Sequence, residues 1–442
     1  MFTVFSATFV KLLYNRYMNI ILKGNICYSK TPQELSVTQG GYLVCADGLS
    51  KGVFDHVPEK YSAFPIKDYG EFLVIPGLID LHTHAPQYAF RGLGMDMELL
   101  DWLRTYTYPE EIKYADVHYA NKAYDIFVSA LSRSATTRAC IFATVHVPAT
   151  TLLMEKLEKS GISSYVGLVN MDRNCPETLR QNSPAEAFEI TNKWIEDTSD
   201  RFENTKPILT PRFIPACSEE LLDKLSCLQQ KFNLPVQSHL SENTKEVELV
   251  KSLNKNPDLT SYAAIYDHYK LFGGFDAPAI MAHCVWCDDK DRQLLRDNGV
   301  YVAHCPQSNS NLASGIAPIR EYLTQGIKTG LGSDVAGGCH LSIFRAMTDA
   351  VQVSKLYHRH VDEKCTPLTL NEAFYLGTLG GGSFFGKVGS FGEDFELDAV
   401  IIDDSPLPSP NPLSLEERLS RVIYFADEIK IVDKYIKGIR TM

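Results

Sequence analysis

The sequence lacks three features that would direct it to nucleic acid, to a membrane or to secretion. Lysine and arginine total 43 against 54 aspartates and glutamates, and a net charge of -11 repels phosphate. No apolar run is long enough to span a membrane, and Lys11 interrupts the fairly apolar start, which has no small-residue cleavage site. The eleven scattered cysteines are typical of reduced thiols. We expect a cytoplasmic protein that binds neither nucleic acid nor membrane, with residues 1–17 as a peripheral extension.

One catalytic signature, one metal-binding signature and one phosphate-binding signature are also missing. The His-x-Glu and Pro-Cys-x-x-Cys pair of cytidine-deaminase zinc sites does not occur, so that type is not expected. Cys284 and Cys287 form a single Cys-x-x-Cys without a second pair, which favours a structural role. The glycines at 380–382 lack a phosphate-binding lysine and are typical of a helix end or a turn.

The sequence does contain a long alternation of strand and helix patterns. Its 442 residues, 45% hydrophobic and 22% charged, indicate a globular protein with one large domain and a smaller one. Apolar segments predict eight buried strands, at 78–84, 139–146, 164–170, 207–212, 234–239, 279–283, 300–304 and 328–334. Helical patterns lie between most of them, for example at 185–197, 219–232 and 288–297. This order predicts an α/β fold, a (β/α)8 TIM-like barrel over residues 76–385.

Short strand patterns at both ends of the chain predict the smaller domain. Several strand-like pieces separated by glycine, asparagine and serine lie within 18–75. Two more follow the barrel, at 398–403 and 429–437, on either side of a proline-rich loop. We expect 18–75 and 386–442 to form one small β-sandwich domain that covers the barrel.

The stretch PGLIDLHTH at 76–84 carries the first candidate site residues. A proline-glycine turn opens an apolar strand that ends in polar residues. Residues two apart on a strand point to one face, so His82 and His84 aim at the same point, with Asp80 on that face beneath them. Two imidazoles in this arrangement predict half of a divalent metal site. The alternative is two histidines that only form hydrogen bonds near a strand end.

Downstream strands end in further candidate ligands. Barrel enzymes place their chemistry at the carboxyl ends of the strands, and the polar residues predicted there are Arg212, His239, His283, His304 and Asp334. His82, His84, His239 and Asp334 would bring three imidazoles and one carboxylate to one mouth. This set suits Zn²⁺, one ion per chain, with Fe²⁺ also open. His283 would bind the metal or hydrogen-bond the nucleophile.

Glu242 stands three residues after His239, where the strand gives way to a loop or helix. That position suits a proton shuttle between water and substrate, whereas the alternative is a carboxylate favoured by a helix N-terminus. We interpret His146 and His304 as residues that fix loops or support the ligands.

An ordered set of motifs identifies a resemblance that extends over nearly the whole chain from about residue 18. The chain resembles the amidohydrolase superfamily of metal-dependent barrel hydrolases, and within it the guanine deaminase family. The motifs are PGLIDLHTH (76–84), HAPQYAF (84–90), LLDWL (99–103), FATVH (142–146), TPRF (210–213), QSHLSEN (237–243), HCP (304–306) with Ser308 and Asn309, and LGSDVAGG (331–338). Ser333, Arg91 and Arg138 are mild departures that do not touch the expected ligands.

The resemblance implies a role for each matching position. It implies that His82, His84, His239, His283 and Asp334 hold zinc, and that Glu242, Asp334 and His283 act in catalysis. It further implies that His84, Gln87, Arg212, Phe213, His239, Glu242 and Asp334 contact a purine base. The implied reaction is hydrolysis of guanine to xanthine and ammonia. The resemblance also suggests a homodimer.

Two other functions stay open from the sequence. A related aminohydrolase would act on a different heterocyclic amine, such as 8-oxoguanine, cytosine or a triazine. A catalytically silent barrel would serve as a scaffold, but a scaffold is expected to lose ligands, and here every candidate ligand and Glu242 are present.

Overall fold

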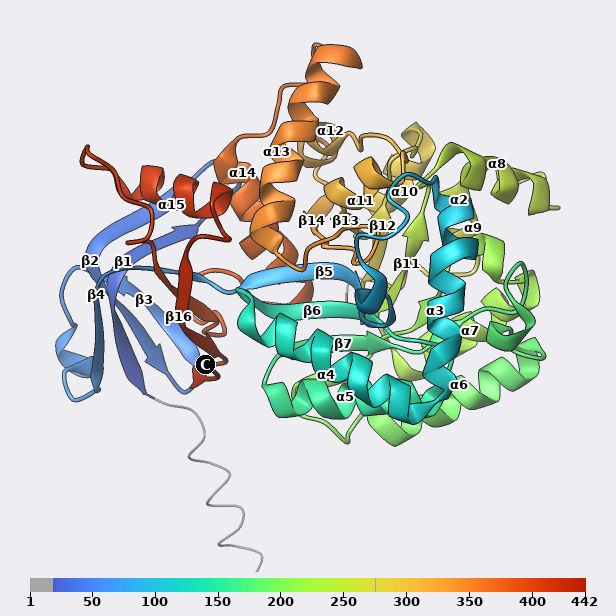
Figure 1. Cartoon of the computed structure of the whole chain (residues 1–442), viewed down its shortest axis with the longest axis horizontal. Coiled ribbons are helices and arrows are strands. Elements are labelled where there is room, and N and C mark those ends of the chain that lie inside the picture. Colours follow the sequence, from blue (N-terminus) through green and yellow to red (C-terminus); the bar gives the residue numbers. More distant parts are fainter. Residues whose placement is uncertain (1–18, 275) are drawn as a thin grey trace, which may run out of the picture.

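A computed structural model describes residues 19–274 and 276–442 (Figure 1). The expected extension at 1–17 lies outside these residues. A β domain stands beside a larger α/β domain, and strands from both ends of the chain meet in the β domain. Among the helices of the described part, none is both long and apolar enough to cross a membrane.

The β domain is built on one seven-stranded sheet with the order β17-β16-β15-β4-β1-β2-β3. Antiparallel pairing of β15 with β4, in which Ile401 faces Val74, joins the two chain ends. Hydrogen bonds connect all seven strands into one sheet that is built from both ends of the chain. Its strands are β1 (Ile20–Ser29), β2 (Leu35–Ala46), β3 (Leu49–Phe54), β4 (Ile66–Pro76), β15 (Ala399–Asp403), β16 (Lys430–Ile436) and β17 (Ile439–Arg440).

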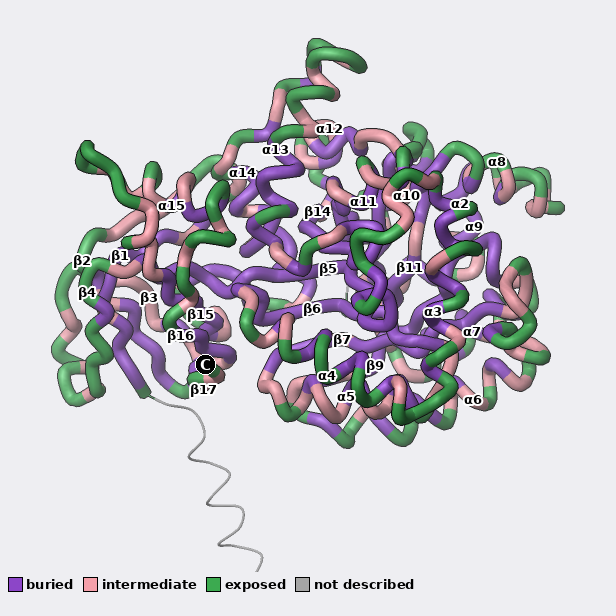
Figure 2. Tube along the Cα trace, in the orientation of Figure 1, coloured by how far each residue is buried: buried purple, intermediate pink, exposed green. Residues whose placement is uncertain are grey.

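The larger domain contains two four-stranded parallel sheets, β5-β6-β7-β9 and β11-β12-β13-β14, and a two-stranded sheet, β10-β8. Each predicted strand has a counterpart, and strand 300–304, the one with the shortest spacing, pairs with both neighbours. The strands are β5 (Leu78–His84), β6 (Thr136–Phe142), β7 (Ser163–Gly167), β8 (Val169–Asn170), β9 (Thr205–Pro207), β10 (Thr210–Pro211), β11 (Val236–Leu240), β12 (Ala279–His283), β13 (Tyr301–His304) and β14 (Lys328–Leu331). Figure 2 shows β5, β6 and β7 as largely buried.

The helices surround the strands of the larger domain, apart from the last one, at Leu415–Tyr424, which packs against β1 and β2 of the β domain (Figure 1). They are α2 (Leu99–Trp102), α3 (Tyr108–Ile112), α4 (Val117–Arg133), α5 (Val147–Ser160), α6 (Pro184–Thr198), α7 (Glu219–Phe232), α8 (Thr244–Leu253), α9 (Tyr262–His268), α10 (Asp289–Asp297), α11 (Pro306–Asn311), α12 (Ile319–Thr324), α13 (Ile343–His360), α14 (Leu370–Tyr375) and α15 (Leu415–Tyr424). The π-helical segment η3 (Leu103–Thr107) joins α2 to α3, so 99–112 forms one continuous covering helix.

Local signals explain why α7 matches its predicted bounds. The Ser218 hydroxyl accepts a hydrogen bond from the Leu221 N–H and caps the start of the helix. Asn233 follows the last turn with a φ of 48°, the left-handed conformation in which asparagine often ends helices. Between these caps, leucines on one face are buried in the core.

Residues that follow α14 form hydrogen bonds to the amino end of β6 and to the chain just before it. Arg138, on β6, donates from Nε to Asp398 (2.7 Å) and from Nη2 to Glu396 (2.8 Å). Lys434, on β16, donates from Nζ to the carbonyls of Ser132 (2.6 Å), Ser134 (3.1 Å) and Thr136 (3.2 Å) at the end of α4. Charged side chains therefore bind the β domain to the strands of the larger domain.

Candidate active site

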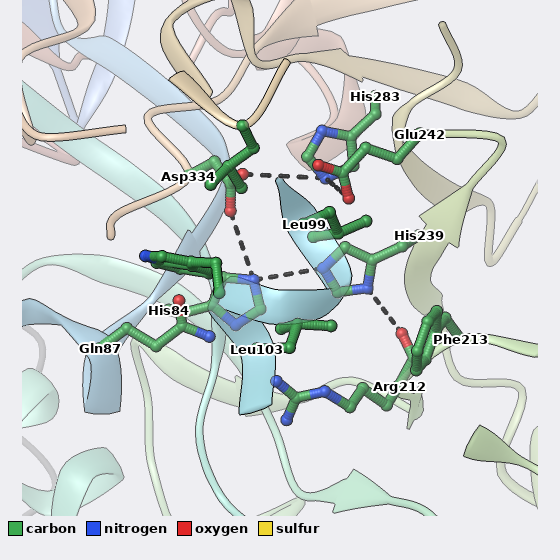
Figure 3. Close-up of a pocket in the computed structure, with 12 residues that line it drawn as sticks. His84, Gln87, Leu99, Leu103, Arg212, Phe213, His239, Glu242, His283 and Asp334 are labelled. Atoms are coloured by element: carbon green, nitrogen blue, oxygen red, sulfur yellow. Dashed lines mark hydrogen bonds and ion pairs between the residues drawn. The ribbon is translucent and has the colours of Figure 1, made fainter. Parts of the chain in front are cut away.

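Five side chains predicted as metal ligands converge at the carboxyl ends of the strands. Figure 3 shows four of them, His84, His239, His283 and Asp334. His82 and His84 lie on β5, His239 on β11, His283 on β12, and Asp334 follows β14. Asp334 Oδ1 lies 3.1 Å from His82 Nε2 and 3.4 Å from His84 Nε2. His84 Nε2 is 3.2 Å from the Nε2 atoms of both His82 and His239. The fold brings together residues that are far apart in the sequence.

Hydrogen bonds fix the ring orientation of two of these histidines. His239 Nδ1 donates to the carbonyl oxygen of Arg212 (2.6 Å), and His283 Nδ1 donates to Asn309 Oδ1 (2.9 Å). A neutral imidazole that donates from Nδ1 keeps a lone pair on Nε2. His283 Nε2 has no hydrogen-bond partner among the described residues. Both rings therefore present an acceptor nitrogen to the cluster.

Burial sets the protonation states of the cluster. Burial lowers the pKa of His84 to about 4 and that of His239 well below its usual value. Burial alone would raise the pKa of Asp334, but His82 and His84 hold it well below its usual value. Neutral imidazoles and an ionised carboxylate are the forms that bind a divalent ion.

The donor atoms fit a divalent metal ion. Within the described residues, three overlapping groups have ligand atoms no more than 4.8 Å apart, namely His82 with His239 and His283, His82 with His84 and Asp334, and His283 with Cys305 and Asp334. The first two groups offer the imidazole and carboxylate donors that suit zinc or ferrous iron. Burial raises the pKa of the Cys305 thiol well above its usual value, so it stays protonated and is a poor ligand.

The Asp80 carboxylate supports the site through hydrogen bonds to Ser333 and His82. It belongs to none of these groups of described residues. Its carboxylate accepts hydrogen bonds from the backbone N–H of Ser333 (3.0 Å), from the Ser333 hydroxyl (2.5 Å) and from the His82 N–H (3.2 Å). Asp80 thus holds the end of β14, and with it Asp334, against β5.

Glu242 points into the site rather than serving the start of α8. The N-cap of α8 is Asn243, and the Glu246 carboxylate accepts the N–H groups of both Glu242 and Asn243. Glu242 Oε1 accepts a hydrogen bond from the Ser314 hydroxyl (3.1 Å), and Oε2 lies 3.4 Å from His283 Nε2. Burial, then the nearby charge of Asp334, raises the pKa of Glu242 well above its usual value.

A cavity of about 420 Å³ opens beside the cluster. Residues predicted to contact substrate line it together with an apolar cover from the helix 99–112. The lining residues are His84, Gln87, Leu99, Trp102, Leu103, Arg212, Phe213, His239, Glu242, His283, Leu312 and Asp334. Leu99, Trp102 and Leu103 face the cavity, which explains why the LLDWL motif is apolar on one side.

Glu111 is a buried carboxylate that sequence reasoning missed, and it joins two of the predicted substrate contacts. Arg212 donates from Nη1 to Glu111 Oε2 (2.6 Å) and from Nη2 to Oε1 (3.1 Å). Gln87 Nε2 also donates to Glu111 Oε1 (3.1 Å). Burial alone would lower the pKa of Arg212, but Glu111 and Tyr108 outweigh it and raise the pKa. Glu111 was missed because no motif or spacing links α3 to the strand ends.

The remaining candidates lie outside the cavity. His146 precedes α5, and His304 is buried at the end of β13. Burial lowers the pKa of His304 to about 3, so it is neutral. Cys284 and Cys287 are free, buried thiols, and neither belongs to a candidate metal group of the described residues.

Comparison with known proteins gives one consistent set of matches. The sequence model of the Amidohydrolase family matches residues 73–439. A guanine deaminase of Dictyostelium discoideum is 38% identical over 97% of this chain and 94% of its own length. The guanine deaminase of Homo sapiens is 35% identical over 82% of each chain.

A solved structure is similar over almost its whole length. It is a guanine deaminase from C. acetobutylicum with bound guanine in the active site. That structure is 44% identical to this chain, has a TM-score of 0.91, and the match covers 95% of this chain and 99% of that one.

Proposed function

The chain belongs to the amidohydrolase family, and on that premise we propose that it hydrolyses guanine to xanthine and ammonia. The observation that carries the proposal is the convergence of three imidazoles and Asp334 beside a cavity lined by Gln87, Arg212 and Phe213. The relatives described above, which are 35%, 38% and 44% identical to this chain over the matched residues, are guanine deaminases. Guanine breakdown or salvage would be the process that this reaction serves.

We assign the metal to the cluster at the strand ends. His82, His84, His239, His283 and Asp334 would hold one zinc ion per chain, with ferrous iron as the other ion that suits these donors. When bound, such an ion polarises a water molecule and lowers its pKa towards neutrality. The Nε2 lone pairs of His239 and His283, fixed by their Nδ1 hydrogen bonds, support this assignment.

Glu242 and Asp334 carry the protons of the reaction. One of these carboxylates accepts a proton from the attacking water as its oxygen bonds to C2 of the purine. Glu242 Oε2 then delivers a proton to the adjacent ring nitrogen, N3. The second proton of that water, passed by a carboxylate to the amine, lets the tetrahedral carbon collapse, which breaks the C2–N bond and releases ammonia and xanthine. Because Oε1 accepts from Ser314, Oε2 is the oxygen of Glu242 that is free for this transfer.

The other cavity residues hold the base. Arg212 has only donors, which suit the carbonyl and ring-nitrogen edge of guanine better than an amine. Gln87 offers one donor and one acceptor, and the Phe213 ring, 7% exposed, offers an apolar contact. Leu99, Trp102 and Leu103 exclude water above the base, which strengthens the polar contacts below them.

We also propose that the strands close into a (β/α)8 barrel over 76–385. In support, backbone hydrogen bonds cross both gaps between the four-stranded sheets, from Gln237 N to Leu209 O (2.9 Å) and from Asp334 N to His82 O (2.8 Å). We propose that 18–75 and 386–442 form a β-sandwich in which the single sheet folds over its own apolar face. A separate buried cluster that includes Leu22, Leu43 and Ile401 supports this.

For the assembly and its location, we propose a cytoplasmic homodimer. All eleven cysteines are free, as suits a reducing compartment. The proposal of a dimer rests on the family resemblance, and light scattering of the purified protein would measure the mass in solution.

The test of the function is a comparison of substrates. Zinc-loaded protein is incubated separately with guanine, 8-oxoguanine, cytosine, adenine and an amino-triazine, and ammonia release is measured. We expect guanine to be turned over fastest and to yield xanthine. If another amine is turned over faster than guanine, that amine replaces guanine as the proposed substrate. If the zinc-loaded protein releases no ammonia from any of the five compounds, a catalytically silent scaffold is favoured.

A further inference from the structure

Glu111 is not needed as a metal ligand or a proton carrier, yet it contacts two residues that face the base. We propose that Glu111 is a positioning residue that sets specificity, because it fixes the orientation of the Gln87 amide and of the Arg212 guanidinium. The inference rests on the guanine deamination proposed above. The Glu111 residue is buried, with only 2% of it exposed.

The Gln87 amide has one favourable orientation because of its two neighbours. On one side, Nε2 donates to Glu111 Oε1 (3.1 Å), and on the other, Oε1 accepts from the Ala336 N–H (3.3 Å). A carboxylate only accepts and a backbone N–H only donates, so an amide turned by 180° would face both with the wrong atom. One N–H and one lone pair of Gln87 remain for the base. Without Glu111, the amide is held from one side only.

The Arg212 guanidinium is held in the same way. Both terminal nitrogens donate to Glu111, and the Arg212 and Glu111 side chains are only 4% and 3% exposed. A paired guanidinium with both ends bonded has a fixed plane, so its remaining N–H groups point in fixed directions. Glu111 therefore decides where the donors of Arg212 meet the base.

The location of Glu111 links this orientation to the cover of the cavity. Glu111 lies on α3, in the same continuous helix 99–112 whose Leu99, Trp102 and Leu103 line the cavity. The carboxylate that orients the two polar residues and the apolar cover of the cavity thus belong to one element. If a base carries a hydrogen-bond donor where guanine carries an acceptor, it meets polar groups of Gln87 and Arg212 that are held in place and cannot rotate to accept from that donor.

A pair of purines tests this directly. Guanine and 2,6-diaminopurine both carry the reacting amine at C2, but C6 bears a carbonyl in guanine and a second amine in the analogue. The measurement is kcat and KM for both purines with zinc-loaded wild type, Glu111→Ala and Glu111→Gln. We expect Glu111→Ala to raise KM for guanine at least about tenfold and to lower the kcat/KM preference for guanine at least about tenfold. Glu111→Gln, which keeps one acceptor, should lie between.

The matched control is the adjacent residue. Glu110 is similarly buried at 6% but bonds Lys113 (2.7 Å) and Tyr119, away from the cavity. Glu110→Gln should lower the Tm without changing the preference between the two purines. Equal losses of kcat/KM on both purines in Glu111→Ala, with the preference unchanged, would overturn the inference alone. Wild-type protein that deaminates neither purine would overturn the proposed function, and this inference with it.

Discussion

The two ends of the barrel strands both bury charge, but they use it differently. At the amino ends, Arg138 is 3% exposed and Asp398 2%, and they are bonded to each other and to Glu396. At the carboxyl ends, His82 is fully buried and Asp334 is 6% exposed, yet ring nitrogens there keep free lone pairs. Burial alone does not separate the two clusters.

What separates them is whether the polar atoms are satisfied. A buried charge with all its partners stabilises the native arrangement, and removing one partner is costly. Buried donors and acceptors without partners cost stability and remain where a ligand or a reaction uses them. Barrel enzymes are expected to place stabilising contacts at the amino ends of their strands and catalytic residues at the carboxyl ends.

Removing the metal is expected to have the largest effect, and only at the carboxyl ends. Chelation should abolish ammonia release and lower the Tm, because a ligand at about 100 times its Kd adds about 2.7 kcal/mol of stability. Zinc should restore both in the wild type but neither in Asp334→Asn. Calorimetric scans with and without zinc measure the shift. An undiminished rate in the metal-free protein would contradict the assignment of the cluster.

Breaking the amino-end cluster is expected to affect stability rather than chemistry. Arg138→Met leaves Asp398 buried without its guanidinium and should cost about 3–5 kcal/mol in the free energy of unfolding. The double variant Arg138→Met/Asp398→Asn should recover part of that loss, because it removes the unpaired charge. Chemical denaturation measures both, and kcat of the folded protein should stay within about twofold of the wild type. A large fall in kcat with an unchanged free energy of unfolding would mean that the amino-end cluster serves the reaction rather than stability.

A smaller, pH-dependent effect is expected at Lys434, in the same amino-end region. Burial lowers the pKa of Lys434 from 10.5 to about 8. Between these values the unfolded chain binds more protons than the folded one, so stability rises with pH through this window, by at most about 3 kcal/mol. The free energy of unfolding of the wild type minus that of Lys434→Met should therefore increase from pH 7 to pH 10.

The control for this titration is Lys430→Met, since Lys430 is an exposed lysine on the same strand. The pH dependence of the Lys434→Met difference is compared with that of this variant. A difference for Lys434→Met that does not change with pH would mean that Lys434 keeps its usual pKa in the folded protein.

Much of the fold and of the cluster could be predicted because local patterns determine them. The caps at Ser218 and Asn233 set the bounds of α7, and strand alternation placed His82 and His84 on one face. The strand predicted at 139–146 ends instead at Phe142, because the chain leaves the sheet there and turns into α5, which begins at Val147. Glu111 and Ser314 could not be predicted, since their partners are brought close only by the tertiary fold.

Asp80 shows the same limit from the opposite side. Asp80 lies on β5 with the histidines, but its side-chain partner is Ser333, which follows β14. Periodicity gives the face on which a side chain lies, whereas the neighbouring strand decides which groups that side chain can bond. Ser333 supplies the hydroxyl from which Asp80 accepts a hydrogen bond.

The most direct test is ammonia release from guanine by zinc-loaded wild-type protein beside Glu242→Gln. We expect one ammonia and one xanthine per guanine from the wild type. We expect the variant to react about 10²–10⁴-fold more slowly, with zinc content and Tm retained, because it loses only the proton carrier. A variant that deaminates guanine at the wild-type rate, or a zinc-loaded wild type that releases no ammonia from it, would contradict the account.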